Sequence, residues 1–461
     1  MRDLLLAGAV LGMLPVCLWR PWVGILVWNW IGVMSPQWMA WGFAREIPWA
    51  ALVGGTTLAG LLIARDRKPV PWNAQLVLMV VLLAYFMFTT LFAWAPEAAW
   101  DKLKLVTKVI VMVILSTMVI YGKKRIRWLL IVIALSVGYF GIRGAIWAIA
   151  TGGAHSVEGP EGGFMTRNNG IGIGLLMVVP IMLALVREQP HRWQRWGFGL
   201  AAGLCTISVI FTYSRGAWLG LAASAFFMFM RSKRKILIAL ALAPVLFAGS
   251  LLVPSKLMER AETIGNYQKD GSAMQRIHTW IVAWNIASES PATGAGFDFE
   301  DSPDRDRWFR HGAPDIYQHM DLVQSAHSIY LQVLGQHGFV AFGLYLFLMF
   351  STLWKCKSLA KRVAGDPELE WIGNYASAIR ISLIGYMVSG AFVSTAYFDL
   401  AWVYYSFTAI LSRELPEHAG TTQKLAVSGN GARQQTAPAT QVAPVPSRSV
   451  VGSAHSHKAG V

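Results

Sequence analysis

Apolar segments long enough to cross a bilayer follow one another from Leu4 to Ile410 of this 461-residue chain. A helix needs about 20 predominantly apolar residues to span the hydrocarbon core. Only 14% of the residues are charged, compared with roughly 25% in ordinary soluble domains. Because so few charges cannot cover a water-facing surface, the sequence predicts an all-α polytopic membrane protein.

The basic residues lie in short clusters between the apolar segments. The formal net charge of +15 could indicate a nucleic-acid partner. Short loops rich in Lys and Arg are typical of the cytoplasmic side of a membrane protein, however, where they also face anionic headgroups. We therefore assign these loops to the cytoplasm and expect no nucleic-acid binding. The clusters are 65–68, 123–127, 187–195, 231–235 and 355–362.

Hydropathy predicts eleven spans after the N-terminal region. They are expected at 49–64, 74–92, 105–121, 128–149, 170–186, 197–212, 216–230, 236–252, 328–353, 372–392 and 399–412. The preceding segments, Leu4–Cys17 and Val23–Met34, form either two spans or one interrupted pass, so we expect 12 or 13 transmembrane helices. No small-residue cleavage site follows the first segment, which predicts an anchor and not a cleaved signal peptide.

Alternation of the spans places four connections outside the cytoplasm: 93–104, 150–169, the turn around Ser214, and 254–326. The predicted organisation is then N-terminal helices at 1–252, a large periplasmic loop at 253–326, and C-terminal helices at 327–413. Residues 414–461 are rich in Ala, Ser, Gln, Pro and Gly and cannot bury enough surface to fold. We expect them to form a disordered cytoplasmic tail.

Ionisable groups at the membrane are expensive and are functional candidates by default. Arg215 begins a span at the outer boundary, where a structural arginine could equally extend its guanidinium to the interface. In the outer loop, Arg276 and Trp280 share one helix face, which is also typical of a solvent-exposed cation stacked on an indole. Residues 290–297 read as a turn with close backbone approach.

His327 begins an outer helix, where a neutral imidazole could accept a proton from a hydroxyl or serve as a polar cap. His337 lies deeper in the same helix and is expected to make a packing or polar contact.

Four further cations on the outer side are open between anion binding and structural pairing. They are Arg143, Arg167, Lys104 and Lys108. Asp304-Arg305-Asp306 imitates a carboxylate metal site but also reads as an ordinary solvated loop. The three cysteines lack CxxC spacing, which argues against a disulfide framework or a thiolate metal site. The chain has no HExxH motif, phosphate-binding loop or dinucleotide fingerprint.

Two short patterns resemble the signatures of bacterial O-antigen ligases. Arg215 followed by Leu219 resembles their Arg-x-x-x-Leu pattern. His327-Ser328, nine intervening residues and Gly338 resemble their His-[Asn/Ser/Gln]-x9-Gly pattern. That pattern continues with Gly, Thr or Tyr, whereas this chain has Ala341, which weakens the match.

The outer loop carries the rest of the resemblance. Arg276 and Trp280, followed by Pro291, Gly294 and Gly296, resemble the large loop shared by O-antigen ligases, O-antigen polymerases and protein O-oligosaccharyltransferases. The resemblance covers roughly residues 10–410. It implies a GT-C-like fold in the bacterial inner membrane, with an active site that faces the periplasm.

The resemblance also implies a reaction. The enzyme would move O-antigen from undecaprenyl pyrophosphate to the lipid A–core, without metal or cofactor. A base on the face of the sugar opposite the leaving group would favour a single displacement with inversion. Arg215 and Arg276 would bind the pyrophosphate and His327 would act as the base. Additional binding residues would come from Trp280, Gln324 and Ser328.

Other acceptors and one other class stay open. A growing O-antigen chain would make the protein a polymerase, and a protein Ser or Thr would make it an oligosaccharyltransferase. The N-terminal region, rich in Pro and Trp, also resembles ligases of exopolysaccharide and exosortase systems. A polysaccharide or lipid transporter would use intramembrane arginines along a path, but transporters commonly show paired halves, and none is visible in the sequence.

Overall fold

The computed structural model describes residues 1–160, 162–163, 165–231, 271–303 and 325–416, without the side chains of 231 and 271–273. Residues Met1–Glu414 form one compact unit. The predicted span at 236–252, the sequence 304–306, Gln324 and all but the first residues of the predicted tail lie outside the described residues.

Within the described residues, the regular structure is helical, apart from a single β-bridge between Gly159 and Arg167. The first nine α-helices are α1 (Arg2–Trp19), α2 (Pro21–Met34), α3 (Trp49–Ile63), α4 (Ala74–Thr90), α5 (Pro96–Ser116), α6 (Gly122–Ala150), α7 (Arg167–Glu188), α8 (Arg192–Phe211) and α9 (Arg215–Arg231). The later ones are α12 (Gly271–Glu289), α14 (Ile329–Arg362), α15 (Glu370–Gly390) and α16 (Asp399–Arg413). Short 3₁₀ helices are η1 (Pro36–Met39), η2 (Phe43–Arg45) and η4 (Phe299–Asp301).

Four of these helices, α1, α6, α7 and α14, are long and apolar enough to cross a membrane. Helices α2, α3, α4 and α9 are apolar but shorter. Large apolar side chains are exposed along several of them, for example Leu4, Phe88 and Phe350. Such surfaces are unfavourable in water and natural in lipid. The expected class, a helical membrane protein with several spans, is therefore confirmed, while a total of 12 or 13 stays a prediction.

The N-terminal region forms two helices, not one interrupted pass. Arg20 separates α1 from α2, and Pro21 occupies the first position of α2, where its missing N–H costs nothing. The Asp3 carboxylate at the start of α1 accepts hydrogen bonds from the backbone of Gly42 and Ala44, 2.8 and 3.2 Å away. Because these residues follow α2, the two helices run in opposite directions.

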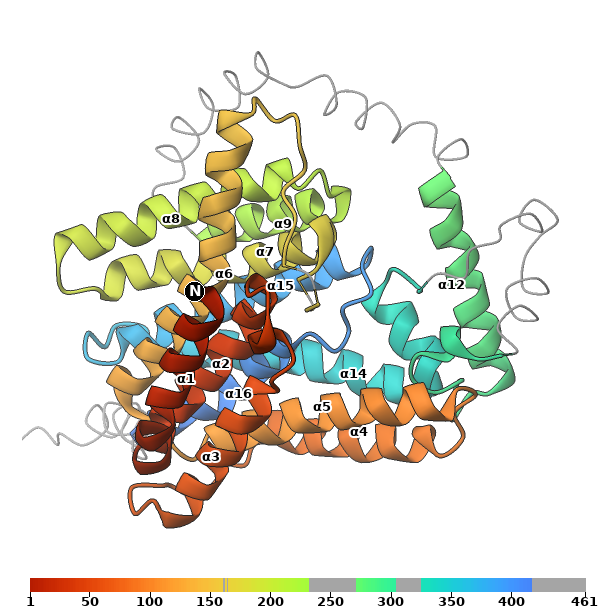
Figure 1. Cartoon of the computed structure of the whole chain (residues 1–461), viewed down its shortest axis with the longest axis horizontal. Coiled ribbons are helices and arrows are strands. Elements are labelled where there is room, and N and C mark those ends of the chain that lie inside the picture. Colours follow the sequence, from red (N-terminus) through yellow and green to blue (C-terminus); the bar gives the residue numbers. More distant parts are fainter. Residues whose placement is uncertain (161, 164, 232–270, 304–324, 417–461) are drawn as a thin grey trace, which may run out of the picture. The chain divides into compact units, whose positions relative to one another are not determined.

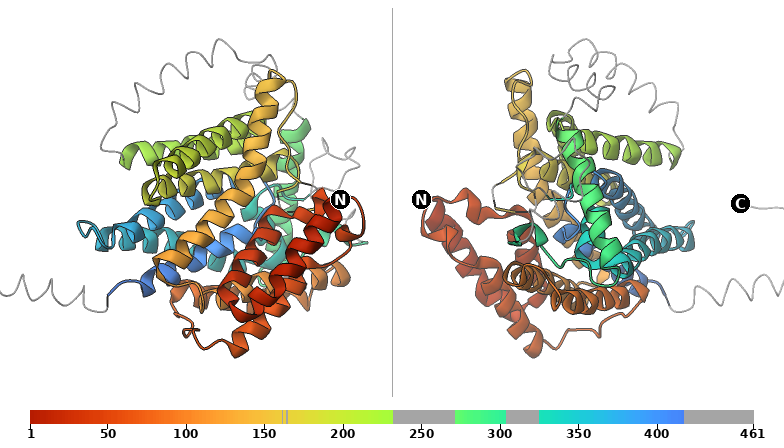
Figure 2. Two further views of the ribbon diagram at one scale, coloured as in Figure 1. Left: turned by 60° about the vertical axis from the view of Figure 1, so that its left-hand side comes forward. Right: turned by 90° about the vertical axis from the view of Figure 1, so that its right-hand side faces the viewer.

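The interior is formed by helices that are apolar on all sides, as expected for helices surrounded by others. In α16, every residue from Leu400 to Leu411 is buried, and α7 is buried from Gly170 to Met182. Helix α15 packs against α7, α9 and α14, and α14 also packs against α4 and α12. Helices α4 and α5 lie side by side (Figures 1 and 2).

The connections that we predict to be cytoplasmic contact one another at one end of the helices. Arg125 forms an ion pair with Asp66 at 2.7 Å, and Lys123 forms one with Glu188 at 2.9 Å. The backbone N–H of Gly122 donates to the Glu414 carboxylate at 2.9 Å. Three predicted cytoplasmic loops and the end of α16 therefore meet, as the predicted alternation requires.

The connections that we predict to be on the outer side also contact one another. The backbone N–H of Trp94 donates to Ala295 at 2.9 Å, which joins the connection before α5 to the large loop. The Asn168 side chain donates to the carbonyl of Thr212 at 3.0 Å, which joins the connection before α7 to the turn before α9. The grouping of loops is therefore the one that the charge pattern predicts.

Candidate functional site

The residues predicted to bind the anionic donor and to act as the general base lie at or near the starts of helices on the predicted outer side. Arg167 is the first residue of α7 and Arg215 the first of α9. His327 lies two residues before Ile329, the first residue of α14, and Ser328 between them is the buried N-cap residue of that helix. Arg276 lies in the second turn of α12. Gln324 lies outside the described part of the chain.

The starts of α7, α9 and α14 gather around the last residues of α15. A Cβ placed on Gly216, beside Arg215, would lie 3.1 Å from the Cβ of Phe392. A Cβ on Gly390 would lie 2.6 Å from the side chain of Ile329, the first residue of α14. A Cβ on Gly172 would lie 2.8 Å from Ala217, so α7 approaches α9 equally closely. The N–H groups and dipoles of helix starts favour bound anions.

The His327 imidazole lies within the electrostatic influence of two arginines. Burial, and then the positive charges of Arg276 and Arg167, hold the pKa of His327 below its ordinary value. Each effect disfavours the charged imidazolium, since burial removes water and the guanidinium groups repel a third positive charge. Both effects favour the neutral imidazole, which is the form that can accept a proton.

Trp280 connects the segments that carry these residues. Its indole N–H donates to the carbonyl of Ala326, the residue before His327, at 2.8 Å. Its ring lies 6.5 Å from the ring of Phe392, which adjoins the start of α9. Because Trp280 is one turn from Arg276 on α12, one side chain links three of the predicted site segments.

The backbone near the site adopts left-handed conformations at residues other than glycine. The φ angle is 61° at Arg167, 55° at Tyr213 and 45° at His327. Such conformations are costly for residues with a Cβ and occur where the surrounding structure enforces them. The Tyr213 hydroxyl donates to the carbonyl of Gly153, which fastens the turn before α9 to the connection before α7.

The turn at 290–297 docks onto a break in α14, which confirms the predicted close backbone approach. The N–H groups of Ala295 and Gly296 donate to the carbonyls of Gly335 and Gln336, at 3.0 and 2.8 Å. The break therefore exposes carbonyls that a continuous helix would use internally, and the turn satisfies them.

Gly338 makes this docking possible. It has φ 75° and ψ −174°, a conformation that is essentially restricted to glycine. A Cβ at this position would overlap the carbonyl oxygen of Pro291, which accepts a hydrogen bond from the N–H of Phe339 at 2.8 Å. The glycine that ends the second ligase-like pattern is therefore needed where the outer loop meets α14.

His337 is a fully buried packing residue, as its depth in the helix predicted. Its Nδ1 lies 2.6 Å from the Thr89 hydroxyl and its Nε2 lies 3.0 Å from the Tyr397 hydroxyl. The rings of Phe86 and Phe297 lie 4.4 and 4.3 Å from the imidazole centroid. Both ring nitrogens are thus occupied by partners within the protein.

The weaker cationic candidates do not all join the site. Lys104 forms an exposed ion pair with Asp101 at 2.9 Å, and Lys108 and Arg143 are exposed on α5 and α6. Lys102 is a further cation that no sequence pattern indicated. Its Nζ lies 3.6 Å from the Asp298 carboxylate in the outer loop. Burial raises the pKa of nearby Glu300 to about 7. No sequence spacing distinguishes Lys102 from Lys104. The two differ because Lys102 lies on the face of α5 that contacts the outer loop, whereas Lys104 does not.

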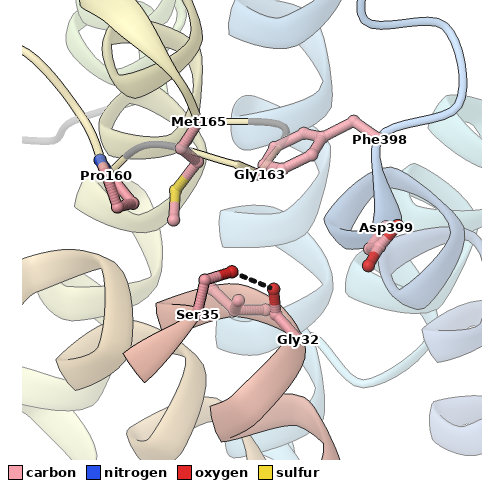
Figure 3. Close-up of a pocket in the computed structure, with 8 residues that line it drawn as sticks. Gly32, Ser35, Pro160, Gly163, Met165, Phe398 and Asp399 are labelled. Carbon is pink, nitrogen blue, oxygen red and sulfur yellow. Dashed lines mark hydrogen bonds between the residues drawn. The ribbon is translucent and has the colours of Figure 1, made fainter. Parts of the chain in front are cut away.

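A small cavity lies on the same side, between the end of α2, the connection before α7 and the start of α16 (Figure 3). Its volume of about 10 Å³ has room for about one water molecule. Asp399 lines it, and one of its carboxylate oxygens is buried without a hydrogen-bond partner in the part of the chain that the structure describes. The Ser35 hydroxyl donates to the carbonyl of Gly32 at 3.3 Å on the opposite wall.

Among the described residues, no group of three or more His, Cys, Asp or Glu side chains could hold a metal ion. The sequence Asp304-Arg305-Asp306 lies outside those residues. The described positive charges at the site come from arginine side chains and helix starts.

These features define a helical membrane protein with cationic and imidazole groups gathered at one end of its helices. Residues 200–346 match a family described as O-Antigen ligase, and this region contains Arg215, Arg276 and His327. The match supports a member of the O-antigen ligase and polymerase superfamily, and confirms the resemblance drawn from the two short patterns. Residues 1–187, which contain Arg167, match a family of unknown function (DUF5935). No curated protein matches the chain.

Proposed function

We propose that this protein is a glycosyltransferase that moves an O-antigen glycan from undecaprenyl pyrophosphate to the lipid A–core. The observation that carries the proposal is the placement of His327 directly before α14, where α9 and α7 also begin, with the charges of Arg276 and Arg167 acting on its imidazole and favouring the neutral form. An acceptor hydroxyl needs a base, and a diphosphate needs positive charge. Both groups are present at one end of the helices.

The arginines would hold the donor. A guanidinium matches phosphate oxygens with two parallel hydrogen bonds, and Arg215 and Arg276 supply such groups from two different helices. As the bond between the sugar C1 and the phosphate oxygen breaks, negative charge grows on the diphosphate. Preorganised cations and helix starts stabilise that charge more in the transition state than in the bound donor, which lowers the barrier.

His327 would act as the general base. Its neutral ring takes the proton from an acceptor hydroxyl as the hydroxyl oxygen forms its bond to C1. The bond from C1 to the phosphate breaks at the same time, and undecaprenyl pyrophosphate leaves with the bonding electrons. One displacement from the face opposite the leaving group inverts the anomeric configuration, so a product that keeps the donor's configuration would contradict this step.

The proposed site faces the periplasm and the C-terminus the cytoplasm. The clustering of the basic loops at the opposite end supports this orientation, because Lys and Arg accumulate in cytoplasmic loops. A polyprenyl donor anchored in the outer leaflet would present its diphosphate at the level where α9 and α14 begin.

Replacement of His327 by alanine tests the base. The purified full-length protein is mixed with lipid-linked O-antigen from a ligase-deficient strain and with lipid A–core. We expect transfer to fall about 10²- to 10⁴-fold, the usual contribution of a general base, while the melting temperature stays unchanged. His191→Ala, at an exposed position before α8, is the matched control and should keep full activity. Undiminished transfer by His327→Ala would refute the base.

Mass spectrometry of the product decides the acceptor. Glycan on lipid A–core supports the ligase, whereas a lengthened lipid-linked glycan or a glycosylated Ser or Thr assigns the same site to polymerisation or protein glycosylation. Transfer by the purified protein in detergent rules out a transporter, because no compartments remain between which a substrate could move.

A further inference from the structure

Trp280 occupies a position between the three segments of the proposed site. Its indole N–H donates to the Ala326 carbonyl at 2.8 Å, and its ring lies near the ring of Phe392, which follows α15 and adjoins the start of α9. Arg276 lies one turn before it on the same helix. Trp280 is a candidate binding residue by its place in the sequence, whereas its described contacts are with the protein itself.

The hydrogen bond to Ala326 acts on the peptide that leads into His327. His327 has φ 45°, a conformation that residues with a Cβ adopt only under constraint. On its other side the chain is fixed, because Ser328 is buried and its carbonyl accepts the first hydrogen bond of α14 from Gln332 at 2.8 Å. The backbone is therefore held directly before His327 by Trp280 and directly after it by the start of the helix.

Helix α12 can transmit this constraint because it is attached to α14 at two places. One is the Trp280 bond, and the other is the docking of the turn at 290–297 onto the break at Gly338. Between them, Ala283 contacts Gly335, where a Cβ on the glycine would lie 3.0 Å away. These two attachments tie α12, which carries Arg276, to the segment that carries His327.

We propose that Trp280 is a positioning residue, whose indole N–H holds the backbone before His327 so that the imidazole faces the acceptor hydroxyl. This inference rests on the proposed function. A misplacement of about 1 Å can cost roughly 100-fold in rate without weakening binding, because alignment is needed only in the transition state. Trp280 therefore acts on kcat through His327 and not on affinity for the donor.

The test removes the N–H and keeps the ring. In Trp280→Phe, we expect kcat for glycan transfer to fall roughly 10- to 100-fold, with KM for the lipid-linked donor within about twofold. The acid limb of the pH–rate profile should move to higher pH, because a less buried imidazole regains part of its ordinary pKa. Trp284→Phe, one turn further on α12 with its ring 5.6 Å from Phe339, is the matched control and should change neither quantity.

A second variant guards against loss of folding. Incorporation of β-(3-benzothienyl)alanine at position 280 keeps the shape of the indole and replaces only its N–H by sulfur. The same decrease in kcat and the same displaced acid limb are expected. Wild-type kcat and pH profile in this variant would overturn the positioning role while His327→Ala remains inactive. Full activity of His327→Ala would instead refute the proposed function, so the two failures are distinguishable.

Discussion

Two histidines ten residues apart at the beginning of α14 differ in almost every physical respect. His327 is half-buried, has a left-handed backbone, and lies near Arg276 and Arg167. His337 is completely buried directly before the break in α14, and hydroxyl groups occupy both of its nitrogens. The first imidazole belongs to a strained backbone position and is acted on by two positive charges, whereas the second is bonded to two hydroxyl groups inside an aromatic cluster. Histidine can therefore be suited to the proposed catalytic role or to packing, according to the groups that surround it.

Replacement of His337 is expected to have a large effect on stability. We expect His337→Ala to lower the free energy of unfolding by about 3 kcal/mol, since it leaves a cavity within an aromatic cluster and removes a partner from the Thr89 and Tyr397 hydroxyls. Denaturation in SDS measures this change. Activity per folded molecule should stay close to wild type, and a loss comparable to that of His327→Ala would show that both histidines take part in catalysis.

The next largest effect is expected at Gly338, which separates His337 from the rest of α14. Gly338→Ala places a Cβ against the Pro291 carbonyl at a φ of 75°, and we expect a loss of about 2 kcal/mol. Gly343→Ala is the matched control on the same helix, because a Cβ there meets nothing within 4 Å and alanine favours helix. Equal melting temperatures for the two variants would contradict the need for glycine at the break.

The smallest effect concerns the charges around His327. A general base works in its neutral form, so transfer should rise with pH through the pKa of His327 and be constant above it. Because that pKa is depressed, the acid limb should lie below pH 6.5, the ordinary value. Arg167→Gln removes one repelling charge, so the pKa should rise and the limb should move to higher pH.

Arg167→Lys retains the positive charge and should leave the limb in place. The pH dependence of kcat for the three proteins provides the measurement. A limb that does not move in Arg167→Gln would show that Arg167 is too far from the imidazole to influence it.

Local patterns predicted much of the fold because hydropathy acts residue by residue. The predicted spans at 49–64, 74–92 and 170–186 correspond to α3, α4 and α7 within a few residues. Helix α5 begins at Pro96, nine residues before the predicted span, because its first turns lie against the outer loop. The hydropathy pattern carries no information about such a contact.

The candidate site was predictable only in part. The short patterns identified His327 and Gly338, but no pattern predicted that the glycine serves a backbone docking or that Trp280 bonds to Ala326. Lys104 and Lys108 share an outer helix face in the sequence, whereas Lys102 faces Asp298 in the structure. Periodicity shows which residues share a face, but it does not show what that face meets.

The sequence alone determined the class of protein, the grouping of its loops and the two ligase-like patterns, because bilayer length, charge asymmetry and short motifs are local properties of the chain. Tertiary structure decided which cations surround His327, why α14 breaks at Gly338, and how α12 is held. These depend on contacts between residues far apart in the chain, such as Gly216 with Phe392, whose approach follows from packing and not from the order of residues.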